Sequence, residues 1–135
     1  MLTKPALSLE DAKTVAAAVV AEAERRKLKI VLAIVDDGGH LLYFERRDGC
    51  RLGALYSATA KAYTSALYRR STKIYDDALA GGTTMLLAMP NMVPVEGGTP
   101  LYHSGGCVGA IGISGATANE DGELGLVAAK ALAEL

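Results

Sequence analysis

The chain has 135 residues, which is enough for one domain with a hydrophobic core but not for two. Half of the residues are hydrophobic, yet there is no Trp and only one Phe, so the core must be built from Ala, Val, Leu and Ile. The net charge is −1 and six of the seven arginines fall into three separated pairs, which excludes the continuous basic face typical of a nucleic-acid partner.

The hydropathy of the chain predicts how it assembles and where in the cell it lies. The mean hydropathy of +0.22 is high for so small a chain and predicts contacts between subunits, hence a homo-oligomer. The N-terminal residues MLTKPALSLEDAK contain no apolar signal-peptide segment, and the longest apolar run, Ile30–Val35, is too short to cross a membrane. We therefore expect a cytoplasmic protein with no membrane partner.

The first predicted element is an amphipathic helix that begins after Ser8. Apolar residues recur at helical spacing over 9–23, while charged residues lie mostly on the other side. Ser8 and Asp11 have the spacing of a capping box, in which each side chain binds the other residue's N–H.

A β-hairpin follows over residues 30–49. Ile30–Val35 is apolar on both faces, as in a central strand, and Asp37-Gly38-Gly39 supplies the turn. The second strand, 41–46, is predicted to direct Leu42, Phe44 and Arg46 inward, and Asp48-Gly49 ends it.

The middle of the chain predicts a helix from about Leu55 to Arg70, whose small residues allow close packing on a sheet. The segment KIYDDALAG then predicts a short helix. Thr84–Met89 is ambiguous between a strand and a short helix, and Pro90 and Pro94 exclude a regular helix between them.

Two more strands and a closing helix complete the prediction. The strands lie within 95–116 and are joined by the turn His103–Gly106. Glycines at 106, 109, 112 and 115 match neither a dinucleotide fingerprint nor a phosphate-binding loop; they indicate a strand thinned so that other atoms can approach its backbone. The helix is predicted to be capped by Asn119, with acidic residues in its first turn.

Four motifs in this order resemble the GlcG-like proteins, which include the haem-binding HbpS-like proteins and the C-terminal domain of PduO-type proteins. The motifs are VDDGGHLLYFERRDG at 35–49, SATAKAYTSA at 57–66, GGTPLY at 97–102 and VGAIGISGA at 108–116, followed by Asp121. The resemblance implies one mixed α/β domain over 1–135, profilin-like, with three α/β/α layers, a five-stranded antiparallel sheet and homo-oligomers. The fifth strand would have to come from Thr84–Met89 or Val93–Glu96.

The function that the resemblance implies is less uniform. Some members bind haem, and others lie beside genes of glycolate or diol metabolism without an assigned reaction. We expect a protein that binds haem or another planar carboxylate-bearing molecule near a subunit interface. The binding would be noncovalent, since no CxxCH motif is present. Two alternatives stay open: a cofactor-independent isomerase, lyase or deaminase acting on a small organic acid, and an accessory subunit of a catabolic enzyme system.

The matched motifs contain four candidate ligand-binding or catalytic residues, Arg46, Asp48, Lys61 and Thr64. Lys61 stands alone in a run of small, uncharged residues, so it either extends to solvent or meets a carboxylate or an anionic ligand. Arg46 could pair with Asp48 or hold a carboxylate with two parallel hydrogen bonds.

The remaining candidates surround the GGTP motif. Gly97, Gly98, Thr99 and Pro100 form either an anion-binding turn with exposed N–H groups or an ordinary turn before a strand. In the enzyme alternative, Lys61 or Arg46 would fix the substrate carboxylate, and Glu96 or Tyr63 would move a proton.

Histidine could supply an axial ligand to haem iron. His40 and His103 do not have the spacing of a metal site, and either can be a surface residue. His103 is the better axial candidate because it closely follows GGTP; Tyr102 and Met92 are nearby alternatives. No resident metal ion is predicted.

Overall fold

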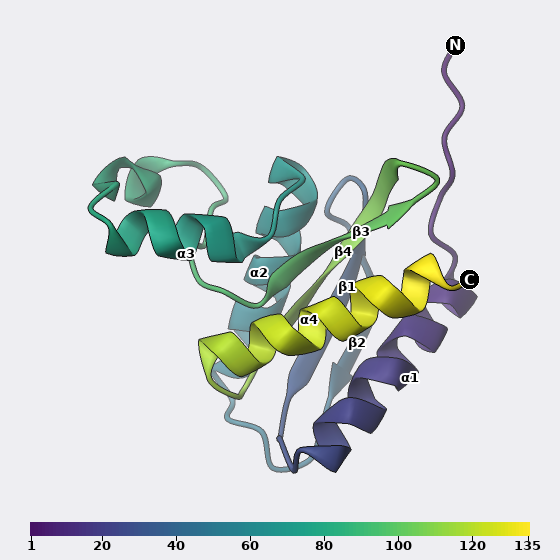
Figure 1. Cartoon of the computed structure of the whole chain (residues 1–135), viewed down its shortest axis with the longest axis horizontal. Helices are drawn as coiled ribbons and strands as arrows, with labels where there is room; N and C mark the ends of the chain where they lie inside the picture. The colour runs from purple at the N-terminus through teal and green to yellow at the C-terminus, as the bar shows by residue number, and fades with distance from the viewer.

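The computed structural model describes all residues, 1–135. Its elements, in chain order, are α1 (Leu9–Arg25), β1 (Val31–Asp36), β2 (Leu41–Arg46), α2 (Ala54–Tyr68), α3 (Thr72–Ala80), the 3₁₀ helix η1 (Thr84–Ala88), β3 (Gly98–His103), β4 (Gly106–Ser114) and α4 (Ala118–Ala133). The strands form one antiparallel sheet in the order β2-β1-β4-β3. Helices α1 and α4 cover one face and α2 covers the other (Figure 1). The predicted mixed architecture is thus confirmed.

The sheet separates two hydrophobic cores, and the segment around β1 contributes residues to both. Ile30, Leu32 and Ile34 pack into a cluster of 16 buried residues beneath α1 and α4. Val31, Ala33 and Val35 alternate with them and join a cluster of 8 residues beneath α2. The apolar run Ile30–Val35 is therefore buried on both faces, as expected for a central strand. None of the helices combines the length and the apolar composition needed to cross a membrane.

The prediction of a five-stranded sheet is wrong, because the sheet has four strands. Thr84–Ala88 forms η1, and residues 93–96 form no strand. Two backbone donors of the second segment are bound by side chains: Val93 N–H donates to Thr64 Oγ1 at 3.0 Å, and Glu96 N–H to the Asp76 carboxylate at 2.8 Å. Those N–H groups are unavailable to a neighbouring strand.

The helix boundaries follow the prediction with two differences. Ser8 and Asp11 form the predicted capping box of α1. Helix α2 ends at Tyr68, because Arg69 adopts a left-handed conformation with φ of 55°. Helix α4 is capped by Thr117, not Asn119; the Thr117 hydroxyl binds Glu120 N–H and the Glu120 carboxylate binds Thr117 N–H. Asn119 lies inside the first turn.

Strand β4 is the central glycine-rich strand that the sequence predicts. It pairs with β1 on one side and β3 on the other. A Cβ on Gly112 would overlap the Ala58 carbonyl oxygen and lie 2.5 Å from Ala62 N, so the glycine allows α2 to rest on the strand. This close approach brings the residues of α2 to the edge of the sheet, where the candidate site lies.

Candidate functional site

Lys61 is the most deeply buried cation of the chain, with 3% of its surface exposed. Its Nζ donates to the Ile113 carbonyl at 3.0 Å and to Asp121 Oδ2 at 3.1 Å. Of the two alternatives that the sequence leaves open, extension into solvent is therefore wrong. The lysine of α2 meets a carboxylate of α4 and forms the single ion pair between these two helices.

A missing side chain at Gly97 makes room for this pair. Gly97 lies just before β3, and a Cβ on it would stand 2.7 Å from Lys61 Nζ and 2.6 Å from the Ile113 carbonyl oxygen. The residue also has φ of 133°, which an L side chain rarely adopts. Lys61 thus passes the end of the edge strand and connects the two helical layers.

Asp121 is the acidic partner, and it is 2% exposed. Burial raises the pKa of its carboxyl above the ordinary value, while the Lys61 ammonium and Ala116 N–H act in the opposite direction. Each carboxylate oxygen accepts one hydrogen bond, Oδ2 from Lys61 Nζ and Oδ1 from Ala116 N–H at 3.2 Å.

A hollow of about 240 Å³ lies beside the ion pair, and we call it the Lys61 cavity. It is lined by Ser57 and Lys61 of α2, Val93 and Val95, Ser114 at the end of β4, and Ala116, Ala118 and Asp121 around the start of α4. Its walls are therefore partly apolar, and they also carry the charged groups of Lys61 and Asp121 and the hydroxyl groups of two serines. A cavity with buried titratable groups is the usual form of a small-molecule site.

The GGTP motif lies under α2. Gly97, Gly98 and Thr99 are buried, and Gly98 N–H donates to Thr72 Oγ1 at 2.8 Å. A Cβ on Gly98 would overlap the Lys61 carbonyl oxygen, and Thr99 packs against Gly125 of α4. Gly98 N–H is thus not free for an anion. Pro100 stands on the edge strand β3, where its missing N–H costs no ladder bond.

Thr64 does not line the Lys61 cavity, and its hydroxyl is hydrogen-bonded to the backbone. Its hydroxyl donates to the Ala60 carbonyl at 2.9 Å and accepts from Val93 N–H at 3.0 Å. This contact holds the segment around Val93 against α2, and so supports one wall of the cavity.

The proton-moving candidates lie elsewhere. The Glu96 carboxylate packs against Gly122 of α4, and one of its oxygens is 4.0 Å from Lys73 Nζ. The Tyr63 ring packs against Gly39 in the β1–β2 turn. Neither residue lines the Lys61 cavity.

Arg46 and Asp48 lie away from the Lys61 cavity, near the end of β2. Both are exposed, so the prediction that Arg46 points inward with Leu42 and Phe44 is wrong. They line a polar hollow of about 630 Å³ near the end of β2 but form no ion pair with each other. Arg47 makes the ion pairs there, with Glu24 and Glu45.

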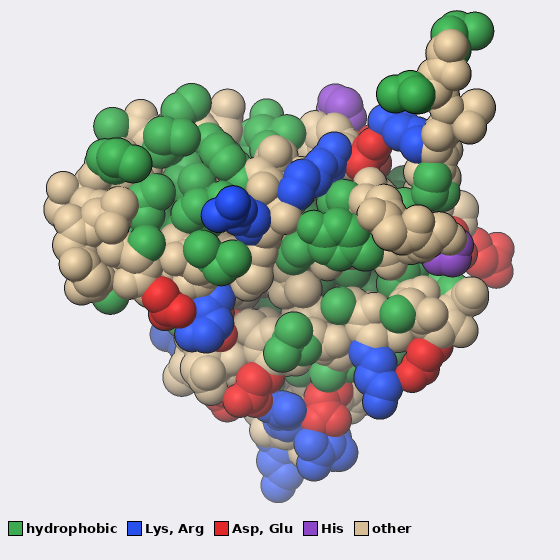
Figure 2. Space-filling view, turned by 45° about the horizontal axis from the view of Figure 1, so that its top comes forward, with side chains coloured by type: hydrophobic (Ala, Val, Ile, Leu, Met, Phe, Trp, Pro, Cys, Tyr) green, Lys and Arg blue, Asp and Glu red, His purple; other side chains and the backbone are tan.

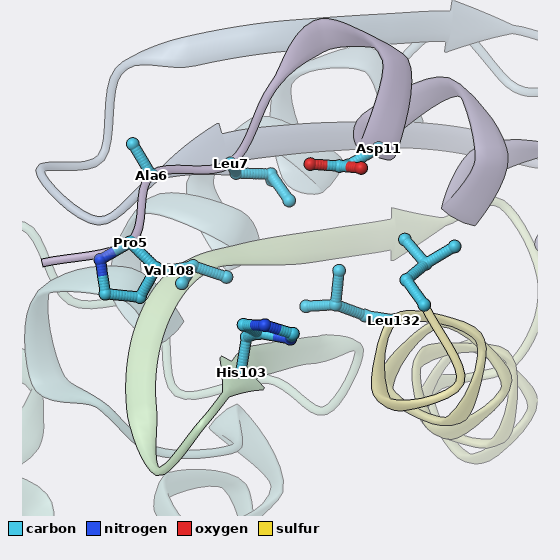
Figure 3. A pocket seen from close by; sticks show the side chains of 8 residues that line it. Pro5, Ala6, Leu7, Asp11, His103, Val108 and Leu132 are labelled. Atoms are coloured by element: carbon cyan, nitrogen blue, oxygen red, sulfur yellow. The ribbon is translucent and has the colours of Figure 1, made fainter.

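His103 lines a separate, mainly apolar pocket of about 360 Å³, which we call the His103 pocket. Its other residues are Pro5, Ala6 and Leu7 of the N-terminal segment, Asp11 of α1, Val108 of β4, and Leu132 and Leu135 at the C-terminal end. Figure 3 shows the imidazole at the end of β3, among the Val108 and Leu132 side chains. No group of the chain hydrogen-bonds the His103 ring.

The other residues considered as iron ligands are placed differently. His40 is exposed and its Nδ1 lies 3.1 Å from Asp36 Oδ1. Tyr102 donates to the Arg69 carbonyl at 3.0 Å, and Met92 does not line the His103 pocket. No group of three or more His, Cys, Asp or Glu side chains lies close enough together to hold a metal ion.

Sequence reasoning missed two features of these hollows. Asp121 matched the family motif, but nothing along the chain identified it as the partner of Lys61, which lies 60 residues away. Ser114 was not singled out, although a hydroxyl beside glycines in an otherwise apolar strand was a usable signal.

Comparison with known proteins gives consistent matches. Residues 7–132 match the pattern of a family described as haem-degrading, HbpS-like proteins. Protein GlcG of Escherichia coli K12 is 40% identical over 114 residues, or 84% of this chain and 85% of that protein. An uncharacterised 15.0 kDa protein of Citrobacter freundii is 32% identical over 96% of this chain and 94% of its own.

Solved structures share the fold. A double mutant of HbpS from Streptomyces reticuli superposes with a TM-score of 0.88 and 30% identity, over 98% of this chain and 90% of that chain. A PduOC:heme complex superposes with a TM-score of 0.84 and 26% identity, over 94% and 95% of the two chains.

Proposed function

The chain belongs to the HbpS-like family, and from this premise we propose that it binds haem, or another planar carboxylate-bearing molecule, noncovalently. The similar PduOC structure is described as a complex with haem.

The observation that carries the proposal is the position of His103 in an apolar pocket. A histidine nitrogen is a common axial ligand of haem iron, and the flat ring system of haem requires apolar walls. Leu7, Val108 and Leu132 supply such walls, and both nitrogens of the His103 ring lack a partner within the chain. When bound, haem would supply an iron centre; the chain would supply its ligand nitrogen and its apolar surroundings.

The pocket covers only part of a planar ligand. His103 is exposed, and 53% of the Leu135 surface is exposed as well. A ligand as large as haem would therefore present its second face outward, where a second copy of the chain can cover it. We include this homo-oligomeric arrangement in the proposal.

A haemin titration of the purified protein tests the proposal. We expect a saturable Soret band in the unmodified protein and a strongly weakened one in His103→Ala. His40→Ala is the matched control, because His40 is the only other histidine and lies outside the pocket. A featureless, unsaturable spectrum of the unmodified protein would refute haem binding. A normal titration of His103→Ala would refute the assignment to this pocket.

The enzyme alternative receives less support from the geometry. It requires a carboxylate-fixing cation and a proton-moving group around one substrate. Arg46, Glu96 and Tyr63 each lie outside the cavity that Lys61 lines.

A further inference from the structure

We propose that the Lys61 cavity binds a short-chain aliphatic monocarboxylate, held by the Lys61 ammonium, the Ser114 hydroxyl and the first-turn N–H groups of α4. This site shares no residue with the His103 pocket, so the proposal is independent of haem binding.

Lys61 has one hydrogen-bond donor to spare. An ammonium group carries three N–H donors, and the Ile113 carbonyl and Asp121 Oδ2 accept from two of them. Because Lys61 is 3% exposed, bulk solvent does not satisfy the third. Lys61 lines the cavity, so a ligand oxygen placed there can accept that proton in a charge-assisted hydrogen bond.

Ser114 is a largely buried residue whose hydroxyl has no partner in the chain. It is 9% exposed and lines the same cavity, yet no group of the protein hydrogen-bonds its Oγ. Its neighbour Ile113 packs under α1 and α4, so strand alternation directs Ser114 to the α2 side. Because no group of the chain uses it, this hydroxyl is free to donate to a ligand oxygen placed in the cavity.

The start of α4 adds further donors. Ala118 lines the cavity, and neither its N–H nor that of Asn119 is bonded within the chain. The capping box takes the next donor, since Glu120 N–H binds the Thr117 hydroxyl. The positive end of a 16-residue helix favours a negative group at this position.

The remaining features select the kind of anion. Each oxygen of Asp121 already accepts one hydrogen bond, whereas Lys61 and Ser114 line the cavity with donors that the chain does not use, which favours an anion. Because Asp121 offsets the charge of Lys61, a singly charged ligand suits the site better than a multiply charged phosphate. Val93, Val95, Ala116 and Ala118 provide apolar contact for a short alkyl chain. A volume of about 240 Å³ accommodates a few carbon atoms.

Propionate is the probe, and propionamide is its neutral control of nearly equal shape. We would follow backbone amide signals in ¹H–¹⁵N spectra at constant ionic strength. Propionate is expected to shift the Ser114, Ala118 and Asn119 signals saturably, and propionamide to bind at least about tenfold more weakly. The proposal is overturned if propionate gives no saturable shift at these residues, or if the amide binds as tightly.

The variant Ser114→Ala tests whether propionate binds in the Lys61 cavity. It removes a hydroxyl that makes no hydrogen bond within the chain. We expect it to weaken propionate about tenfold while the thermal midpoint is unchanged. Ser57→Ala is the matched control, because Ser57 lines the cavity but its hydroxyl already donates to the Gly53 carbonyl at 3.3 Å. Propionate binding that is equally affected, or equally unaffected, in the two variants would contradict the assignment. Since Ser114 is outside the His103 pocket, that failure would leave the haem proposal untouched.

Discussion

At the residue scale, Lys61 and Asp121 form the one ion pair of the chain in which both side chains are buried. Taking both charges out of water is unfavourable, and the pair recovers that cost only through its contacts. Each partner depends on the other, because the two side chains are only 4% and 2% exposed. Losing one of them leaves a buried charge without compensation.

We expect Lys61→Met to lower the free energy of unfolding by about 3–5 kcal/mol, because it leaves the buried Asp121 carboxylate unpaired. The double variant Lys61→Met/Asp121→Asn removes that charge as well and should be more stable than the single one. Urea unfolding measures both. Lys73→Met is the control. Because Lys73 pairs with Asp77 at an exposed position, this substitution should change the free energy of unfolding little. Equal stability of the single and double variants would contradict this account.

The Glu22 carboxyl is expected to make the free energy of unfolding depend on pH. Hydrogen bonds from the Arg25 and Arg26 side chains lower the pKa of its carboxyl from 4.5 to about 2. A lowered folded-state pKa stabilises the fold above the unfolded-state value, and this contribution is lost as pH falls from about 4.5 toward 2. The stability difference between the unmodified protein and Glu22→Gln should therefore shrink in that window. A difference in unfolding free energy that stays constant from pH 6 to pH 2 would argue against it.

At the element scale, the glycines of β4 decide how closely α2 approaches the sheet. Helix α2 presents small residues, with Ala58, Ala62 and Ala66 fully buried against β1 and β4. Gly112 completes this contact, because any side chain there would meet the helix backbone. The short distance between helix and sheet in turn lets Lys61 reach Asp121.

Gly112→Ala should therefore lower the free energy of unfolding by about 3 kcal/mol or more, since the helix must move to admit one methyl group. Gly106→Ala, in the same strand, is the control. A Cβ on Gly106 would meet nothing nearer than 3.8 Å, so we expect almost no change. Thermal or urea unfolding of the two variants makes the comparison, and similar stabilities would show that α2 packing does not depend on Gly112.

At the scale of the whole molecule, hydrophobic side chains gather over α3 and the segment that follows it (Figure 2). We define the α3–η1 surface by Ile74, Met85, Leu87, Met89 and Val95, which are between 40% and 70% exposed. Contiguous exposed apolar surface is typical of an interface. This surface supports the self-association that the mean hydropathy predicts.

The double variant Met85→Glu/Leu87→Glu should lower the molar mass of the particle in solution, because charge on the α3–η1 surface opposes apolar contact between copies. Light scattering after size-exclusion chromatography measures this. Leu126→Glu is the control, since Leu126 is 66% exposed but belongs to α4. A monomeric unmodified protein, or an unchanged mass in the double variant, would contradict the proposed self-association.

Much of the fold was predictable because its signals are local. The Ser8–Asp11 capping box, the apolar period of α1 and the turn chemistry after β1 all depend on residues a few positions apart. The family motifs also predicted helices on both faces of an antiparallel sheet. The number of strands was not predictable in this way, because the Val93 and Glu96 N–H groups are bound by side chains from α2 and α3.

The sequence by itself therefore determined the family of the chain and the order and kind of its elements, except in the segment between α3 and β3. Only the tertiary structure decided that Lys61 is buried against Asp121, that Arg46 faces solvent and that His103 joins an apolar pocket. The physical reason is that periodicity and capping involve neighbours in the chain, whereas burial and pairing depend on which distant segments pack together. Gly97 and Gly112 illustrate this: their identity is visible in the sequence, but the atoms that require them to be glycine come from α2 and β4.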